Sequence, residues 1–401
     1  MLINFLSSAT VRSIKNNRKI VIFSLFFLFA TSGFSQPFNI GHTTKTFFDA
    51  SRNRNIETEI YYPANTNGDN VAIATGNYPV LVFGHGFVMV WSAYQNFWEE
   101  LVPKGYIMCF PKTEGGFSPN HANFGSDLKF IGPAMQSEND ISNSLFFNSV
   151  APKTALLGHS MGGGASFLGA ANNSDITTLI NFAAAETNPS AIAAAATVSV
   201  PTLIFSGDDD CVVPEATNQN LMYNSLASTC KTQIKIINGI HCYYANSNFN
   251  CGFGELTCNP TVDISRSQQQ AITFSFLEPW LDFYLKDNTN AESDFNNLLV
   301  TSNQVNFSQS CTTLNLQEIN STKGIQLFPN PVVDILNLNL ADDNVGGTLK
   351  VYNSLGKKVY DGKIQSSESQ IDLSNLADGF YVIQYGKDSF SFSSKFVKWT
   401  R

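Results

Sequence analysis

One stretch decides the fold of this chain: Ala155-Leu156-Leu157-Gly158-His159-Ser160-Met161-Gly162-Gly163-Gly164. Its apolar start predicts a buried strand, and the small residues at 165–171 predict a closely packed helix. A Gly-x-Ser-x-Gly motif between a strand and a helix is typical of a nucleophile elbow, where a sharp turn exposes the serine above the sheet. Gly158 and Gly162 let the two backbones approach each other at that turn. We therefore predict Ser160 as a nucleophile.

An acid follows the serine along the chain, in the order that such an elbow requires. Residues 201–205 are apolar and predict a buried strand, which ends in Gly207 and three aspartates. Asp210 fits a Gly-x-x-Asp spacing and is our predicted acid, with Asp208 and Asp209 as the alternatives.

A histidine completes this order. Residues 233–237 predict another strand, which leads through Gly239 to His241. Its position after the acid and behind a glycine turn predicts His241 as the general base. His159, the variable residue of the elbow, is expected to pack beneath it.

The sequence Gly84-His85-Gly86-Phe87 follows a predicted strand at 78–83. A turn after an early strand supplies one N–H of the oxyanion hole, and the residue after the nucleophile supplies the other. We therefore predict the backbones of Phe87 and Met161 as the oxyanion donors, with the Phe87 side chain lining the acyl pocket.

The N-terminal residues predict export. Four basic residues precede an apolar run at 20–30, and small residues at 31–35 follow it, which is typical of a signal peptide at 1–35; a membrane anchor is the alternative. Removal of that peptide takes the net charge of the 401-residue chain from −8 to −12. This acidity argues against nucleic acid as a partner. We expect a secreted monomer.

Export makes the seven cysteines candidates for disulfides. Two of them adjoin predicted triad residues, so we expect a Cys211–Cys242 bridge between the acid and histidine loops. We also expect Cys251 to pair locally with Cys258 and Cys109 to be a buried free thiol. Cys230 and Cys311 are left over. No metal site is expected, because His241 and the nearby cysteines contain no Cys-x₂-Cys spacing.

The rest of the chain predicts two domains. At 36–300, strands alternate with helices as in an α/β fold with a mostly parallel sheet and flanking helices. A Gly- and Ser-rich stretch at 112–139 is expected to be a loop over the active-site face, and a lid and an open site are the two alternatives. A polar linker at 301–325 then leads to short alternating strands at 326–401, which predict a small all-β sandwich.

Residues 37–290 resemble the cutinases and polyester hydrolases, including poly(ethylene terephthalate) hydrolases, within the α/β-hydrolase fold. The matching motifs are the elbow at 158–164, the strand at 200–205, the acid at Asp210 and the Gly-x-His turn at 239–241. The resemblance implies a triad of Ser160, Asp210 and His241, the oxyanion donors Phe87 and Met161, and no cofactor. Many relatives carry Trp in a loop that here, at 183–189, has no aromatic residue. Trp91 and Tyr94 are the candidates for a replacement stacking surface. The alternative is that both are ordinary helix-packing aromatics, and a helical pattern at 92–104 places Tyr94 at core-facing spacing.

Residues 327–401 resemble the C-terminal sorting domain of the type IX secretion system. The matching pieces are Phe-Pro-Asn-Pro at 328–331, the segments at 351–357 and 376–382, and Lys-Phe-Val-Lys at 395–398. The resemblance implies the secretion machinery as a partner, while a carbohydrate-binding module is the alternative. The whole chain then predicts a secreted ester hydrolase acting on polyesters and small esters. A lipase or general esterase, and a noncatalytic binding protein, are the other hypotheses.

Overall fold

The structure of the protein is a computed structural model. It describes residues 37–258, 260, 262–311, 325–340, 344–354, 356–387 and 390–399. The expected signal peptide and residues 312–324 of the expected linker lie outside the described residues. No helix in the described ranges is long and apolar enough to cross a bilayer.

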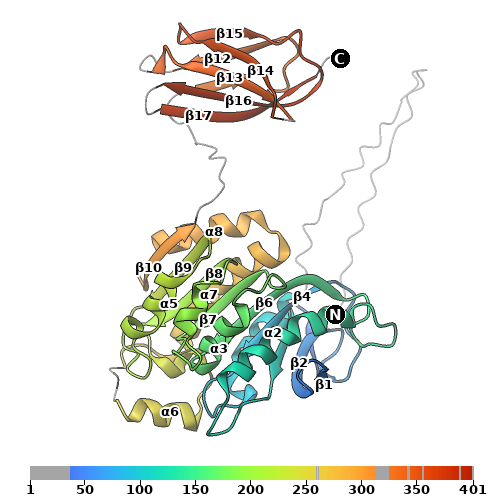
Figure 1. Cartoon of the computed structure of the whole chain (residues 1–401), viewed down its shortest axis with the longest axis vertical. Coiled ribbons are helices and arrows are strands. Elements are labelled where there is room, and N and C mark those ends of the chain that lie inside the picture. The colour runs from blue at the N-terminus through green and yellow to red at the C-terminus, as the bar shows by residue number, and fades with distance from the viewer. Residues whose placement is uncertain are drawn as a thin grey trace, which may run out of the picture. The chain divides into compact units, whose positions relative to one another are not determined.

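A ten-stranded sheet forms the centre of the first domain, in the order β10-β9-β8-β7-β6-β4-β5-β2-β1-β3 (Figure 1). The six strands from β9 to β5 in that order run parallel. Strand β10 pairs antiparallel with β9, β2 pairs antiparallel with β5 and with β1, and the short β3 pairs parallel with β1. Their bounds are β1 Asn39–Asp49, β2 Arg54–Ala64, β3 Gly68–Asp69, β4 Tyr78–Gly84, β5 Ile107–Pro111, β6 Val150–His159, β7 Thr178–Phe182, β8 Thr202–Gly207, β9 Cys230–Ile236 and β10 Val305–Cys311. This confirms the predicted α/β-hydrolase architecture.

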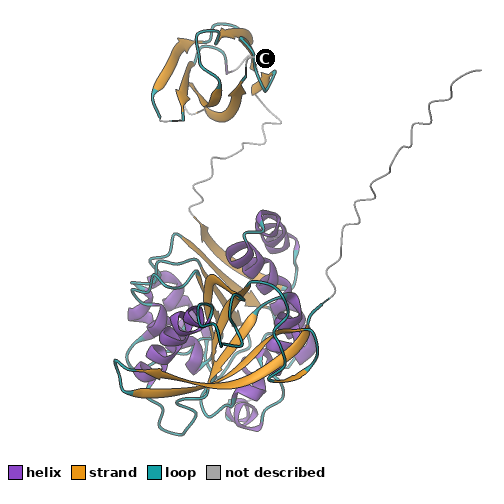
Figure 2. Ribbon diagram, turned by 90° about the vertical axis from the view of Figure 1, so that its right-hand side faces the viewer, coloured by secondary structure: helices purple, strands orange, loops and turns teal. Residues whose placement is uncertain are grey.

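Helices cover both faces of this sheet, as Figure 2 shows. In the central strand β4, Val80 and Val82 join one apolar cluster, whereas Leu81 and Phe83 join the other, because successive side chains point to opposite faces. The first cluster also includes residues of α2 His121–Glu138, α3 Met161–Ala170, α4 Ala191–Ala195 and α5 Gln219–Ser225. The second includes residues of α1 Gln95–Leu101, α7 Arg266–Lys286 and α8 Thr289–Thr301.

The expected loop at 112–139 is largely a helix, which corrects the sequence prediction. Helix α2 starts at Asn120, whose side chain accepts a hydrogen bond from the backbone N–H of Asn123 at 2.9 Å. It packs against α3 and buries an apolar stripe at 3–4-residue spacing: Phe124, Leu128, Ile131 and Met135. Only residues 112–120 remain as a connection, so α2 belongs to the layer that supports the sheet and is not a lid.

The sheet continues into the segment that the sequence suggested was a linker from residue 301. Strand β10 pairs antiparallel with β9 along its whole length, from Val305 opposite Ile236 to Cys311 opposite Cys230. A Cys230–Cys311 disulfide joins the two strands at the end of this pairing. The α/β domain therefore extends at least to Cys311.

The C-terminal residues form a separate small β-sandwich, as predicted. One sheet has the order β11-β12-β15 and the other β14-β13-β16-β17. The strands are β11 Ile325–Phe328, β12 Ile335–Leu340, β13 Thr348–Asn353, β14 Lys358–Lys363, β15 Glu368–Asp372, β16 Gly379–Lys387 and β17 Phe390–Lys398. Alternate residues, such as Leu336 and Leu338, fill an apolar core between the two sheets.

Candidate active site

The elbow lies between β6 and α3, where the sequence predicted it. Ser160 has φ 56° and ψ −120°, a left-handed conformation that side-chain-bearing residues rarely adopt. The turn leaves no space for side chains at the flanking glycines: a Cβ on Gly158 would lie 2.2 Å from the carbonyl oxygen of Gly162. A Cβ on Gly162 would lie 2.1 Å from the carbonyl oxygen of Gly84. These contacts explain why the motif requires glycine on both sides of the serine.

The structure brings Ser160, His241 and Asp210 into one hydrogen-bonded chain. The Nε2 atom of His241 lies 3.0 Å from the Oγ of Ser160, and its Nδ1 lies 2.8 Å from the Oδ2 of Asp210. Because a carboxylate only accepts, Nδ1 carries the proton and Nε2 of the neutral ring is free to accept the serine proton. All three side chains are buried. This is the arrangement of a nucleophile, a base and an orienting acid.

The three competing aspartates lie in different environments. Asp210 is buried, and its Oδ1 accepts backbone hydrogen bonds from Val212 at 3.0 Å and Val213 at 2.8 Å. These bonds hold the carboxylate toward His241. Asp208 is exposed, and neither Asp208 nor Asp209 contacts the imidazole among the described hydrogen bonds. The geometry therefore agrees with the choice of Asp210.

The loop after β4 brings Phe87 to the same edge of the sheet as the elbow. His85 is buried between two backbone carbonyls, with Nδ1 3.0 Å from Gly86 O and Nε2 2.9 Å from Thr113 O. Half of the Phe87 side chain is exposed. Met161 is the first residue of α3, so its backbone N–H has no partner within the helix and is available to an oxyanion.

Two buried side chains, Tyr94 and His159, link two loops. One is the loop after β4 that carries the predicted donor Phe87, here called the oxyanion loop, and the other is the loop that carries His241. The N–H of Gly86 donates to the Tyr94 hydroxyl at 2.8 Å, and that hydroxyl lies 2.9 Å from Nδ1 of His159. Nε2 of His159 lies 3.1 Å from the backbone carbonyl of His241. Burial, together with the nearby His241 ring, lowers the pKa of His159 well below its usual value, so the ring is neutral. The carbonyl only accepts, so Nε2 donates to it and Nδ1 accepts from Tyr94.

This link was only partly visible in the sequence. The elbow motif placed His159 beneath the serine, whereas Tyr94 was a candidate for an exposed stacking surface, with helix packing as the alternative. Tyr94 is instead fully buried. Trp91, the other candidate, is half-buried and packs on Tyr61 and Trp98, with ring centroids 5.9 and 5.6 Å away. The burial of Tyr94 agrees with its core-facing spacing in the helical pattern, but no sequence signal identified the partners of its hydroxyl.

The disulfides differ from the expected pairing. Cys211 is bonded to Cys258 and Cys242 to Cys251, so the expected Cys211–Cys242 and Cys251–Cys258 bridges are wrong. The prediction failed because the segment that contains the short helix α6, Phe249–Leu256, and the two residues after it supplies a partner to each loop, Cys251 from the helix and Cys258 from beyond its end. Cys109 is a buried free thiol, as expected.

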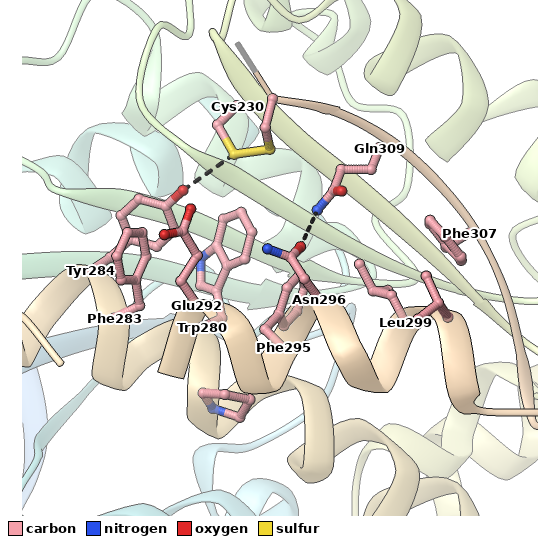
Figure 3. A pocket seen from close by; sticks show the side chains of 13 residues that line it. Cys230, Trp280, Phe283, Tyr284, Glu292, Phe295, Asn296, Leu299, Phe307 and Gln309 are labelled. Carbon is pink, nitrogen blue, oxygen red and sulfur yellow. Dashed lines mark hydrogen bonds between the residues drawn. A yellow bond between two sulfur atoms is a disulfide. The ribbon is translucent and has the colours of Figure 1, made fainter. Parts of the chain in front are cut away.

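A pocket of about 320 Å³ lies elsewhere in the domain, between α7, α8, β9 and β10 (Figure 3). Aromatic side chains, including Trp280, Phe283 and Phe295, line much of it. The hydroxyl of Tyr284 lies 3.2 Å from the sulfur of Cys230 at its wall. None of the predicted catalytic residues lines this pocket, so it is not the candidate active site. Within the described ranges, no cluster of histidine, cysteine and acidic residues is arranged to hold a metal ion.

Comparisons with known proteins agree with this geometry. The model of a PET hydrolase-like family matches residues 39–257, and the model of a secretion system C-terminal sorting domain matches residues 326–399. Cutinase est1 from Thermobifida alba is 32% identical over 103 residues, which are 25% of this chain and 33% of that cutinase. The match thus spans about a third of the length of this curated relative. The sorting domain implies export by the type IX machinery to the cell surface or the medium.

Proposed function

The chain belongs to the PET hydrolase-like family, and from this membership we propose that it is a secreted serine carboxylic ester hydrolase acting on polyesters and small esters. The observation that carries the proposal is the chain of hydrogen bonds from Ser160 through His241 to Asp210. The residue roles and the substrate are inferred from that geometry and from the family.

In the proposed reaction, the Oγ of Ser160 attacks the carbonyl carbon of the ester while Nε2 of His241 takes the serine proton. Asp210 holds the imidazole in the required tautomer and stabilises its positive charge. The tetrahedral intermediate then expels the alcohol, which takes the proton from His241, and leaves an acyl group on Ser160. His241 next removes a proton from water, which attacks the acyl-enzyme. When the second tetrahedral intermediate collapses, His241 returns that proton to the Oγ of Ser160 and the acid is released. No cofactor takes part in these steps.

The negative oxygen of each tetrahedral intermediate needs hydrogen-bond donors that are already in place. The N–H of Met161 is suited to this role because it also lies at the positive end of the α3 dipole. The N–H of Phe87 is the proposed second donor. In other hydrolases one such donor contributes about 10²–10³ in rate.

The substrate class follows from the surroundings of the serine. Half of the Phe87 side chain is exposed beside the oxyanion loop and offers an apolar wall to an acyl or aroyl group. Helix α2 packs into the layer of helices, so the segment at 112–139 provides no lid to restrict access. An open site accommodates a polymer chain, whereas many lipases cover their site. A lipase or a general esterase is the alternative.

For export, we propose that residues 1–35 are a cleaved signal peptide and that the C-terminal domain is the address for type IX secretion. The catalytic residues all lie before residue 242, so the sorting domain needs to contribute nothing to catalysis.

Initial rates on three substrates test the proposal: a short p-nitrophenyl ester, a long-chain triglyceride emulsion and an amorphous polyester film. We expect hydrolysis of the first and third, and a loss of at least about 10³-fold in Ser160→Ala. Ser166→Ala is the matched control, because it removes a buried hydroxyl from α3, the helix that follows Ser160. That hydroxyl donates to the backbone carbonyl of Gly163 and not to His241.

The outcomes separate the hypotheses. Preference for the triglyceride over the film indicates a lipase, and activity on the soluble ester alone indicates a general esterase. Turnover that survives in Ser160→Ala contradicts the serine mechanism, and a protein without turnover on any ester is a noncatalytic binding protein.

A further inference from the structure

Helix α6 carries exposed apolar side chains along one face. Phe249, Phe253 and Leu256 are 84%, 61% and 77% exposed. Their spacing of four and three residues places them on the same side of the helix. The rings of Phe249 and Phe253 stack with centroids 6.4 Å apart. Side chains this apolar rarely lie together in water unless they bind something.

The opposite side of α6 is fixed to the candidate active site. Cys251, within the helix, forms the disulfide with Cys242, which adjoins His241. Cys258, two residues after the end of the helix, forms the disulfide with Cys211, which adjoins Asp210. The carboxylate of Glu255 accepts a hydrogen bond from the backbone N–H of Cys242 at 2.7 Å. The helix is therefore held by both loops that carry the base and the acid, and it presents its apolar face outward.

The same helix is also joined to the oxyanion loop. The side-chain amide of Asn250 donates to the backbone carbonyl of Val88 at 2.7 Å. On either side of Val88, Phe87 and Val90 are half exposed. Exposed apolar groups thus lie both on α6 and on the oxyanion loop that it contacts.

The face carries no charge of its own. Glu255 is the one ionisable side chain in α6; it lies on the inner side, where burial raises its pKa. No lysine or arginine occurs between His241 and Arg266. An anionic lipid or an acidic protein would need basic residues here, whereas an uncharged polymer needs none.

We propose that the apolar face of α6, formed by Phe249, Phe253 and Leu256, is a docking surface for a solid, uncharged polyester. This proposal rests on the proposed function. Because the two disulfides and the Asn250 contact fix α6 relative to the catalytic loops, a polymer surface that covers this face also covers the loops around Ser160. Docking raises the local concentration of ester groups near the serine without contributing to the chemistry of a soluble ester.

Adsorption to amorphous poly(ethylene terephthalate) nanoparticles tests the proposal directly. It is measured in the Ser160→Ala background of the full mature chain, so that hydrolysis does not alter the surface. We expect Phe249→Ser/Phe253→Ser/Leu256→Ser to weaken adsorption at least about tenfold, because three large apolar side chains lose their contact with the polymer. With Ser160 restored, the same triple variant should keep the parent's kcat/KM on a soluble p-nitrophenyl ester and lose rate on film.

The matched control is Phe48→Ser/Leu221→Ser/Val300→Ser, which removes three exposed apolar side chains from β1, α5 and α8. Its adsorption should equal that of the parent. Equal losses in both triple variants mean that general surface hydrophobicity drives adsorption, and an unchanged α6 variant means that the face does not dock polymer; either result overturns the proposal.

Two further outcomes also overturn it. A rate loss confined to a triglyceride emulsion identifies the occupant as a lipid surface. A parent dimer that becomes a monomer in the α6 variant, with adsorption unchanged, identifies the occupant as a second copy of the chain. Failure of the proposed function is separate, because it appears as absent Ser160-dependent turnover, whereas adsorption is measured without turnover.

Discussion

Nε2 of His159 donates a hydrogen bond to the backbone carbonyl of His241 at 3.1 Å, so the residue before the proposed nucleophile Ser160 holds the backbone of the proposed base. The other nitrogen of His159 accepts from Tyr94, whose oxygen accepts from the N–H of Gly86. Gly86 directly precedes the proposed oxyanion donor Phe87. One chain of buried hydrogen bonds therefore fixes the base and the oxyanion loop relative to each other.

Removing the Tyr94 hydroxyl from the middle of these hydrogen bonds should lower kcat more than it changes KM. In Tyr94→Phe, the Gly86 N–H and Nδ1 of His159 both lose a buried partner, which costs about 1–3 kcal/mol of stability. We expect kcat on a soluble ester to fall by up to about 10², with a smaller change in KM, because the oxyanion donor moves away from its optimal position. Steady-state kinetics measure both.

Tyr78→Phe is the control, since that buried hydroxyl bonds only to Ala74 O and Thr75 O among the described contacts. It should lower stability without lowering kcat. Equal kcat values for the two variants contradict the role of Tyr94.

The identity of the acid can be tested by charge removal at three neighbouring positions. Asp210→Asn should lower kcat by about 10³–10⁴, because the asparagine no longer selects the required tautomer of His241. Asp208→Asn and Asp209→Asn should have little effect, since neither side chain bonds to the imidazole. A larger loss of kcat at either of these positions assigns the role of the acid to that residue.

The disulfide pattern predicts which cysteines affect activity. Peptide mapping without reductant should find Cys211–Cys258, Cys230–Cys311 and Cys242–Cys251. One thiol, Cys109, should react only after unfolding, because burial raises its pKa. Cys211→Ser/Cys258→Ser should lower stability by about 2–4 kcal/mol and also lower kcat, since that bridge holds the acid loop.

Cys230→Ser/Cys311→Ser provides the comparison. This bridge joins β9 to β10 and contacts no triad residue, so its loss should reduce the melting temperature while kcat at 25 °C is retained. Loss of kcat in both double variants argues that stability alone links the bridges to activity.

Two buried histidines should make the folded state less stable in weak acid. Burial lowers the pKa of both His159 and His85 below the usual value of 6.5. The groups that face them are Tyr94 and His241 for the first and Glu114 for the second. Above about pH 6.5 both rings are neutral in the folded and unfolded chains. Below it the unfolded chain binds protons that the folded chain does not, so the free energy of unfolding falls by up to about 1.4 kcal/mol per pH unit for each ring.

Urea unfolding at pH 7.5, 6.5 and 5.5 measures this dependence. His159→Asn cannot titrate, so its free energy of unfolding should fall less steeply between pH 6.5 and 5.5 than that of the parent. The comparison removes the opposite contribution of Glu255, whose raised pKa stabilises the fold as the pH falls. Parallel curves for the parent and the variant contradict the prediction.

Strand β10 predicts where the chain can be shortened. A chain that ends after Thr313 keeps the β9–β10 pairing and the Cys230–Cys311 bridge, and it should match the full-length protein in melting temperature and soluble-ester activity. A chain that ends after Asn303 loses both and should be less stable by at least about 2 kcal/mol. Equal melting temperatures for the two truncations contradict a structural role for β10.

Local residue patterns were sufficient to predict much of the fold and of the candidate site. The elbow, the acid after its strand and the histidine after its glycine turn are short motifs, and each is specified by residues close together in the chain. A strand that ends at a parallel sheet's carboxyl edge delivers its next residues to that edge, so chain order alone brought Ser160, Asp210 and His241 together. The C-terminal strands were predictable for a similar reason, because alternation with period two is visible in a few residues.

Only the tertiary structure decided the remaining features, since each depends on contacts between distant segments. Helix α2 contains Gly125, Gly132 and Pro133, which have low helix propensity, and tertiary packing against α3 overrides that propensity. Cysteine partners depend on which segments meet in space, and Cys211 and Cys242 each pair with a cysteine of the segment at 249–258 instead of with each other. Strand β10 is recognisable only by its pairing with β9. The hydroxyl of Tyr94 acquires its partners, the N–H of Gly86 and Nδ1 of His159, only through the fold.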